Sequence, residues 1–285
     1  MGVRPNSTAG SLSESTFRDL QGLIYEQSGI FFAENKKYVL EERLRPRLVT
    51  RGCDSFEDYY CLLRYDAWRD QELIALFDLV TTNETYFYRD RQQLLAFTET
   101  IVPTVIAANK ERKWLRIWSA ACSTGDEPYT LALMLLEMPA LTEWTIEILA
   151  TDISEASLAS ARRGSYDAYA VRNVPPAVLK RYFTEDGGRY VIGPQARAMV
   201  KFMTLNLYDT PRMKIMRGLD VIFCRNCLIY FDDKAKKRIV QGLTESLRVG
   251  GYLVIGFSES LHGVRSGLEP IHSHRAVIYR KAEEQ

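Results

Sequence analysis

The stretch SAACSTGDEPYTLA (119–132) decides the fold of this chain. It links a short apolar run, LRIWSAA (115–121), through a turn at Gly125 to an apolar helical pattern, DEPYTLALMLLEM (126–138). A buried strand, a tight turn and a helix in this order predict the start of a doubly wound α/β domain. Domains of this class bind ligands at the carboxyl ends of their strands, so the turn is a candidate ligand site.

Strand and helix patterns keep alternating towards the C-terminus. TIEILATD (145–152) predicts a strand, and SEASLASARRG (154–164) predicts a helix that Ser154 caps and Gly164 ends. The chain therefore reads as α/β with a mostly parallel sheet, in which the strands at 115–121 and 219–226 are neighbours. The later segments are a strand, LDVIFCRN (219–226), a helix ended by Gly250 and Gly251, DDKAKKRIVQGLTESLRV (232–249), and the strands GYLVIGF (251–257) and HRAVIYRK (274–281).

One region interrupts the alternation, from about residue 165 to 203. It holds a short helix, VLKRYF (178–183), and then DGGRYVIG (186–193) and ARAMVKFMTL (196–205), which we interpret as an antiparallel hairpin unit. The region reads as a small β-subdomain inserted into the sheet domain, where insertions shape substrate access.

The N-terminal part of the chain is helical in pattern. FRDLQGLIYEQSG (17–29) ends at a C-cap glycine, and the next segment places Leu40, Leu44 and Leu48 on one face, with Pro46 expected to kink or reset the helix. FEDYYCLLRYD, opened by Ser55, and RDQELIALFDLV complete four helices. We predict a disordered leader at 1–14, a helical domain at 15–80, a packed linker at 81–95 and the sheet domain at 96–285.

Bulk properties exclude several classes of protein. The 285 residues carry a net charge of +1, so no global field favours nucleic acid or a membrane surface. No apolar run approaches the roughly 18 residues of a membrane span, and MGVRPNSTAGSLSES lacks the apolar core of a signal peptide. Five cysteines without framework spacing indicate reduced thiols, so the expected location is the cytoplasm.

Acidic residues open the helix after the first strand. Asp126 and Glu127 would repel a pyrophosphate, and the glycine pattern GxGxxG is absent, whereas a cation would be tolerated there. S-adenosylmethionine carries a sulfonium and an ammonium and no phosphate, so the site favours it over NAD or ATP. The alternative is that the two acids only stabilise the helix start.

Two further strand ends carry polar candidates. Asp152 offers an acceptor for both ribose hydroxyls of an adenosine, with a helix-capping aspartate as an equal alternative. Asn226, in FCRNCLIYF (223–231), offers both a donor and an acceptor. Cys224 and Cys227 form a CxxC without a second pair, so we expect no metal site. With Cys122 they are expected to cluster at the cofactor pocket, where oxidation would inhibit.

The linker LVTTNETYFYRDRQQL (79–94) places Asn83, Thr85 and Arg89 among aromatic residues. Such a segment is packed, and a structural hinge is its alternative interpretation. In order, TTNETYFYR, SAACSTGDEPYTLA, ATDIS, LNL and FCRNCLIYF closely resemble the CheR family of chemotaxis glutamate O-methyltransferases, with the resemblance running from about residue 15 to 280. It implies a Rossmann-like S-adenosylmethionine-binding domain with a β-subdomain, preceded by a helical domain.

The resemblance also implies the site and its chemistry. The product would be S-adenosylhomocysteine, and the acceptors would be glutamate side chains on the cytoplasmic helical region of chemoreceptors, methylated in chemotactic adaptation. Cys227 replaces the family's usual aliphatic residue, and Asp126 replaces a frequent glutamate; neither change should remove the site. The implied cofactor-binding residues are Asn83, Thr85, Arg89, Glu127, Asp152, Asn206, Leu207, Asn226 and Cys227.

A glutamate carboxylate, with an ordinary pKa of about 4.3, is ionised at neutral pH and needs no general base. Alignment of the reacting atoms should therefore carry catalysis. Arg89 and Tyr230 are the candidates that hold the glutamate, with a core position as the alternative for Tyr230. Arg89, Asn83 and Glu127 argue against a non-catalytic S-adenosylmethionine-binding regulatory module. The missing base-flipping motif and glycines argue against a nucleic-acid methyltransferase and a dehydrogenase.

Positive charge is concentrated between Lys36 and Arg51, a segment that contains six basic and two acidic residues. Arg43, Arg47 and Arg51 repeat every four residues and are predicted to dock a glutamate-rich receptor helix, with a solvated basic face as the alternative. The loop TEDGGRYVIGPQAR (184–197) is shorter than in members of the family that bind a C-terminal receptor pentapeptide. We therefore expect tether-independent methylation by a monomer.

Overall fold

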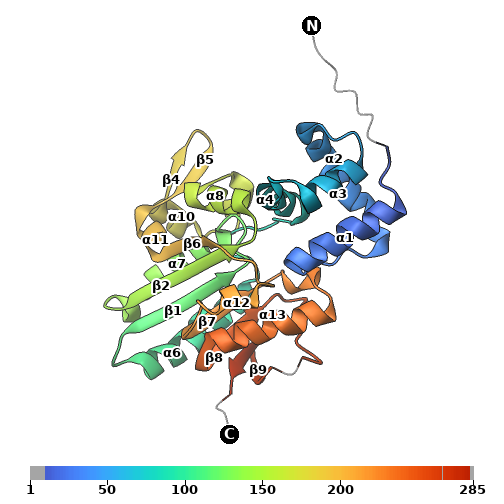
Figure 1. Ribbon diagram of the computed structural model, residues 1–285. Helices are drawn as coiled ribbons and strands as arrows, with labels where there is room; N and C mark the ends of the chain where they lie inside the picture. The colour runs from blue at the N-terminus through green and yellow to red at the C-terminus, as the bar shows by residue number, and fades with distance from the viewer. Residues whose placement is uncertain (1–9, 265, 283–285) are drawn as a thin grey trace. The chain divides into compact units, whose positions relative to one another are not determined.

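The computed structural model describes residues 10–264 and 266–282, and within them the chain divides into two compact units (Figure 1). A helical unit extends to Thr82 and also includes Tyr230–Asp232. An α/β unit holds Asn83–Ile229 and the chain from Asp233 onward. No helix among the described residues has both the length and the apolar character needed to cross a membrane.

Four α-helices build the helical unit, as the sequence patterns predict. They are α1 (Glu14–Ser28), α2 (Lys37–Arg51), α3 (Phe56–Tyr65) and α4 (Arg69–Val80), with a 3-10 turn at Glu34–Lys36 before α2. The leucine stripe of α2 is completely buried. The expected reset of the helix at Pro46 is wrong, because α2 continues through it. The one backbone donor that proline lacks does not outweigh the packing of the leucine stripe on both sides.

The expected leader also needs correction at its end. Residues 1–9 lie outside the described part of the chain, but Leu12 is buried and its N–H donates to Glu41. The Ser13 hydroxyl then accepts the N–H of Thr16 and caps α1. The helical unit therefore includes residues before position 15.

The basic side of α2 is tied into the helical unit by one acid. Glu72 on α4 is 2% exposed, and its carboxylate accepts two hydrogen bonds from Arg47 at 2.6 and 2.7 Å and one from the Tyr59 hydroxyl at 2.8 Å. Arg51 lies 3.2 Å from the same carboxylate. Arg43 instead donates to the Val80 carbonyl and to the Thr82 hydroxyl. The predicted ridge is thus not a freely solvated row of charges, because two of its members neutralise a buried glutamate.

Replacing Arg47 by alanine should destabilise the helical unit. The change removes two hydrogen bonds to a buried carboxylate, and one hydrogen bond to a charged group contributes about 1.5–3 kcal/mol to stability. Because Arg51 compensates in part, we expect the free energy of unfolding to fall by about 1.5–3 kcal/mol in total. Burial raises the pKa of Glu72, but hydrogen bonds from Arg47 and Tyr59 outweigh it and hold that pKa below 4.5. The stabilisation is therefore present above the unfolded pKa and is lost as the pH falls through the lower folded value.

Urea denaturation of the full chain at pH 7 and at pH 4 measures this loss. Arg45→Ala is the matched control, because Arg45 pairs with Glu41 on a more exposed part of the same helix and should contribute well under about 1 kcal/mol. Equal stability of the two variants at pH 7 would show that Glu72 does not need Arg47.

The α/β unit contains a seven-stranded sheet in the order β6-β2-β1-β7-β8-β10-β9. The five strands from β6 to β8 are parallel, and β10 and β9 form an antiparallel edge. The predicted neighbours β1 and β7 pair directly, with Ser119 opposite Phe223. The bounds are β1 Trp114–Ala120, β2 Thr145–Asp152, β6 Val200–Thr204, β7 Leu219–Cys224, β8 Leu247–Ile255, β9 Leu268–Ser273 and β10 Ala276–Lys281.

Helices connect these strands and cover the sheet. The connection from β1 to β2 is α7 (Asp126–Leu136), that from β2 towards β6 begins with α8 (Glu155–Arg163), and α13 (Asp233–Ser246) joins β7 to β8. The stretch before β1 is α5 (Arg91–Ala96), a π-helical turn (Phe97–Ile101) and α6 (Val102–Asn109), and shorter pieces are α12 (Thr210–Met213) and 3-10 turns at Pro139–Leu141 and Leu228–Tyr230.

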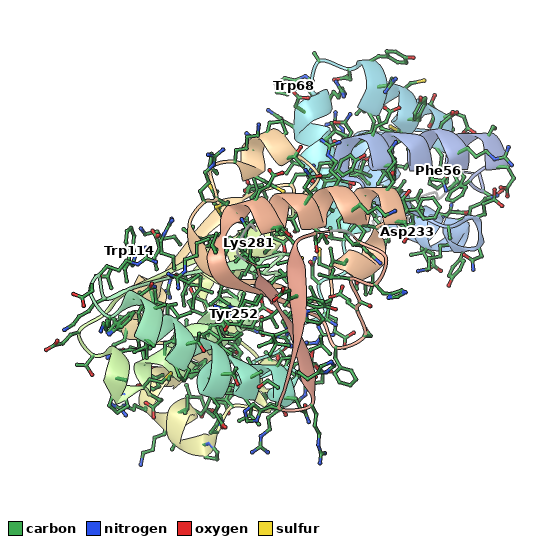
Figure 2. The ribbon with its side chains drawn as sticks, turned by 90° about the horizontal axis from the view of Figure 1, so that it is seen from below. Phe56, Trp68, Trp114, Asp233, Tyr252 and Lys281 are labelled. Carbon is green, nitrogen blue, oxygen red and sulfur yellow. The ribbon has the colours of Figure 1, made fainter. Side chains whose placement is uncertain are left out.

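The end of α13 differs from the prediction. The helix stops at Ser246, and Gly250 and Gly251 lie inside β8 instead of ending the helix. A Cβ on Gly251 would lie 3.0 Å from the carbonyl oxygens of both Leu219 and Arg248, so this position requires glycine within the strand. The Lys281 ammonium donates to the carbonyls of Thr244 and Leu247 and closes the carboxyl end of α13 (Figure 2).

The insertion between α8 and β6 is a small three-stranded sheet in the order β3-β5-β4. The hairpin is β4 (Phe183–Asp186) with β5 (Arg189–Ile192), turning at Gly187 and Gly188 with φ of 56° and 77°. The expected second hairpin partner, 196–205, is wrong, because residues 200–204 are β6 and pair with β2 in the main sheet. The insertion therefore ends before residue 200; its other elements are β3 (Ser165–Tyr166), α9 (Ala168–Val171), α10 (Pro176–Tyr182) and α11 (Pro194–Met199).

Candidate functional site

The loop between β1 and α7 is held in an unusual backbone conformation. Ala121, Ser123 and Gly125 all have positive φ, of 64°, 50° and 90°. Non-glycine residues adopt this region at a cost, and such strain concentrates at functional sites. The Cys122 N–H donates to the carbonyl of Thr151, which fastens the loop to the end of β2. A Cβ at position 125 would lie 2.9 Å from the Ala161 side chain, so this turn can pass α8 only as glycine.

Asp152, at the end of β2, lies beside this loop. Its carboxylate accepts the Ser123 N–H at 2.8 Å through one oxygen and the Ser154 N–H at 2.9 Å through the other, and the residue is 6% exposed. The N-cap of α8 is Ser154 itself, so the contact to Ser154 holds the turn before the helix and Asp152 is not the cap. The carboxylate therefore braces both the β1–α7 loop and the turn before α8.

The two acids at the start of α7 have different surroundings. Asp126 is 1% exposed, accepts the Thr124 hydroxyl at 2.6 Å, and has its pKa raised by burial to about 6. Glu127 accepts the Ser119 hydroxyl at 2.6 Å and the Arg225 guanidinium at 3.1 Å. Burial raises the pKa of Glu127, although the charge of Arg225 opposes the shift. Asp126 thus supports the helix start, and Glu127 belongs to the strand-end site.

Arg225, which the sequence reasoning passed over, lies at the centre of this site. The residue follows directly after β7, and its side chain is 4% exposed. The guanidinium contacts Gln93, Glu127, the carbonyl of Arg89 and the carboxylate of Asp90. The signal for it in the sequence was a lone arginine directly after a fully apolar strand end, because a buried charge must find partners.

A second residue that the sequence reasoning missed organises the turn after β7. The Glu259 carboxylate accepts the N–H groups of Asn226 at 2.9 Å, Ile229 at 3.2 Å and Gly256 at 2.5 Å. Asn226 has a φ of 55°, in the left-handed region. A Cβ on Gly256 would lie 2.8 Å from the Asn226 nitrogen, so the two backbones approach as closely as glycine allows.

Two of the three cysteines that were expected to cluster contact each other. Cys224 and Cys227 are hydrogen-bonded to each other, whereas Cys122 packs in the core with Tyr129 and Tyr166. Hydrogen bonding to Cys227 and burial raise the pKa of Cys224, and burial raises that of Cys122. A raised pKa leaves little thiolate at neutral pH, so Cys122 and Cys224 are poorly suited to oxidation.

The segment that begins the α/β unit packs against the insertion and α7. Phe87 is completely buried, donates its N–H to the Ala170 carbonyl at 3.0 Å and contacts the rings of Tyr166 and Phe183 edge to face. The Asn83 carbonyl accepts the Ser123 hydroxyl at 3.3 Å, which brings this segment to the β1–α7 loop. The Arg89 guanidinium donates to the Glu84 carbonyl at 2.9 Å. Thr85 is half-buried in the same segment.

The remaining predicted residues follow β6 and β7. The N–H of Leu205 donates to the Asp152 carbonyl, and the Asn206 side chain accepts the Tyr208 N–H at 2.9 Å; Leu207 is buried. Tyr230 belongs to the helical unit, where its carbonyl accepts the Phe31 N–H. The residues predicted for the cofactor therefore follow β1, β2, β6 and β7 at one edge of the sheet, together with the 83–90 segment.

The chemistry of this edge fits S-adenosylmethionine. Acids rather than a glycine-rich phosphate loop surround the turn, and a carboxylate, Asp152, ends the second strand beside it. Among the described residues, no group of three His, Cys, Asp or Glu side chains is placed to hold a metal ion.

Comparison with known proteins identifies two matching family models. Residues 83–277 match the SAM-binding domain of the CheR methyltransferases, and residues 15–81 match their all-alpha domain. A chemotaxis protein methyltransferase 2 from Vibrio cholerae is 36% identical over 90% of this chain and 88% of its own length. Chemotaxis protein methyltransferases from Vibrio parahaemolyticus (37%, 96% and 99%) and Pseudomonas aeruginosa (33%, 95% and 99%) are similar along nearly the whole chain.

Proposed function

Because this chain belongs to the CheR methyltransferase family, we propose that it esterifies glutamate side chains of chemoreceptors. It is an S-adenosylmethionine-dependent methyltransferase of chemotaxis. The observation that supports ester formation is that the site offers no free general base. Glu127 is paired with Ser119 and Arg225, and no histidine lies in the motif segments. A carboxylate is the protein nucleophile that is already ionised under such conditions.

We assign the cofactor to the edge formed by the strand ends. Asp152 would accept the ribose hydroxyls, and Glu127 would face the cationic amino-acid part. Cys227 would contact the cofactor through its backbone, so its side chain is not decisive. The other contributing residues are Asn83, Thr85, Arg89, Asn206, Leu207 and Asn226.

The bound cofactor supplies an electrophilic methyl group, which passes to a glutamate oxygen as the carbon–sulfur bond breaks and its electron pair stays on sulfur. An anion and a cation become neutral products, so a site that stabilised either ion strongly would slow the step. The protein's task is to desolvate and align the carboxylate. Arg89 offers a two-pronged donor for it.

The basic face of α2 is the proposed docking surface for the receptor helix. Of the three predicted arginines, Arg43 carries the docking charge best, because it donates only to the neutral acceptors Val80 and Thr82. Arg47 and Arg51 add one net positive charge after sharing Glu72. A glutamate-rich helix is complementary to such a surface.

Replacing Arg43 by glutamate should raise the KM for receptor several-fold, flatten its salt dependence and leave affinity for S-adenosylhomocysteine unchanged. Initial rates at several salt concentrations measure the effect. Arg18→Glu, the same charge change at an exposed position of α1, is the matched control. If both variants raise KM equally, the effect is one of net charge and not of the α2 face.

We also propose that methylation needs no C-terminal receptor pentapeptide, because the β4–β5 hairpin closes through only Gly187 and Gly188. Without a tether, direct contact must supply the affinity, which gives the α2 face more importance. A monomeric state and a cytoplasmic location complete the proposal.

The decisive experiment incubates the full chain with methyl-labelled S-adenosylmethionine and receptor-containing membranes, using receptors with and without the terminal pentapeptide. We expect label on the receptor that base releases as methanol, at similar rates for both receptors. Base-stable label would contradict ester formation. Loss of labelling on truncation, or micromolar binding of the free peptide, would contradict tether independence alone.

A further inference from the structure

The Arg225 guanidinium joins segments that are far apart in the sequence. It donates to Gln93 at 2.7 Å, to the Arg89 carbonyl at 2.9 Å, to Asp90 at 2.7 Å and to Glu127 at 3.1 Å. Gln93 in turn donates to the carbonyl of Ile255, the last residue of β8. One side chain therefore connects the end of β7 with α5, the start of α7 and, through Gln93, the end of β8.

The turn that Arg225 holds is the one that carries Arg89. Tyr88 and Asp90, on either side of Arg89, both have positive φ, at 57° and 58°. Neither residue is glycine, so this backbone persists only where surrounding contacts impose it. The Tyr88 N–H donates to the Thr130 hydroxyl, and the two acceptors that follow, at Arg89 and Asp90, are both taken by Arg225.

The same guanidinium orients Glu127. One oxygen of that carboxylate accepts the Ser119 hydroxyl and the other accepts Arg225. Without the arginine, the carboxylate would keep a single neutral donor in a largely buried place, and a protonated or displaced side chain would become favourable.

We propose that Arg225 is the positioning residue of this site, which fixes the Arg89 turn and the Glu127 carboxylate in one mutual geometry. The inference rests on the roles proposed above for Arg89 and Glu127. Lysine cannot substitute, because a single ammonium cannot donate in the plane to four separated acceptors. Arg225 itself need touch neither substrate nor cofactor.

The test compares Arg225→Gln and Arg225→Lys with Arg248→Gln. Arg248 is a matched control in the same unit: it lies near the start of β8, 2.6 Å from the buried Asp220, so its loss should lower stability without reaching the site. Binding of S-adenosylhomocysteine is measured by calorimetry at pH 6 and pH 8, and kcat and KM are measured with receptor.

Arg225→Gln should lose about tenfold or more in affinity, and more at pH 6 than at pH 8, because the guanidinium that opposes protonation of Glu127 is gone. The groups that act on Glu127 are Arg225, Arg89, Cys122 and Cys224, and only the first is changed. Asp126, whose pKa is about 6, titrates in every variant alike, so the difference between variants reports Glu127. Arg225→Lys should bind with an intermediate affinity and show a reduced kcat.

A purely structural role would lower stability in Arg225→Gln as in Arg248→Gln and leave the affinity and its pH dependence like the parent's; that result would overturn the proposal. If the glutamine variant does not fold, the Lys variant decides: parental kcat and affinity overturn the proposal, and reduced kcat with intact stability supports it. Failure of the parent chain to esterify receptor would contradict the proposed substrate, while the binding measurements would still decide the role of Arg225.

Discussion

Replacing Asp152 by alanine is expected to weaken the binding of S-adenosylmethionine by tenfold or more. A hydrogen bond to a charged acceptor contributes about 1.5–3 kcal/mol, and roughly 1.4 kcal/mol corresponds to tenfold in affinity. The structure adds a second reason for a large effect. The carboxylate also accepts the N–H groups of Ser123 and Ser154, so its removal leaves two backbone donors without their acceptor at the site.

Two variants separate the loss of a ligand acceptor from the loss of a local brace. Asp152→Asn keeps the shape and one acceptor oxygen, and should bind more tightly than the alanine variant but more weakly than the parent. Asp209→Ala removes an aspartate cap, the one that accepts the N–H of Arg212 at the start of α12, shortly after Asn206 and Leu207. Calorimetric titration that showed unchanged affinity in Asp152→Ala would remove this residue from the cofactor site.

The parts of the fold that the sequence predicted are those with local causes. β1, α7, β2 and α8 follow from apolar runs with a capping serine at 154 and a closing glycine at 164, and each is found within a residue or two of its expected bounds. The four N-terminal helices have the same kind of signal in Ser55, Gly29 and the leucine stripe.

The parts that were wrong depend on partners distant in sequence. VKFMT (200–204) has the pattern of a half-buried strand, and nothing local tells a hairpin from the edge of the main sheet. Gly250 and Gly251 have the composition of a helix end, but both lie in β8, where Gly251 passes close to the carbonyls of Leu219 and Arg248. The spacing of the arginines on α2 is visible in the sequence, but their buried partner, Glu72, lies on another helix and could not be predicted from it.

The site shows the same division. The strand-end acids were visible as residues, but the pairing of Glu127 with Arg225, and of Asn226 with Glu259, required the fold. Arg225 and Glu259 belong to no repeating sequence pattern that would indicate their partners. What the sequence did contain was a charge directly after the apolar run VIFC (221–224), and such a charge predicts a buried network rather than a solvated one.

Arg89→Lys should lower kcat for receptor methylation by roughly ten- to a hundredfold, because the carboxylate is no longer held in line with the methyl group. The lysine keeps the charge but not the planar fork that can hold both carboxylate oxygens. It also loses the bond to the Glu84 carbonyl and the position near the Tyr86 ring, with the guanidinium carbon 5.7 Å from the ring centre. Arg89 is held through its carbonyl by Arg225, so the substitution leaves the backbone of the turn in place.

Arg172→Lys is the matched control, because Arg172 stacks on the same ring at 3.7 Å and has no assigned role in holding glutamate. Steady-state rates with receptor give kcat and KM separately, and S-adenosylhomocysteine titration shows whether the cofactor contact of Arg89 is also lost. A fall in kcat with little change in KM would place the interaction in the transition state, as alignment of the carboxylate requires. Parental rates in Arg89→Lys would mean that position 89 supplies only positive charge, and the carboxylate would then have to be aligned by another group.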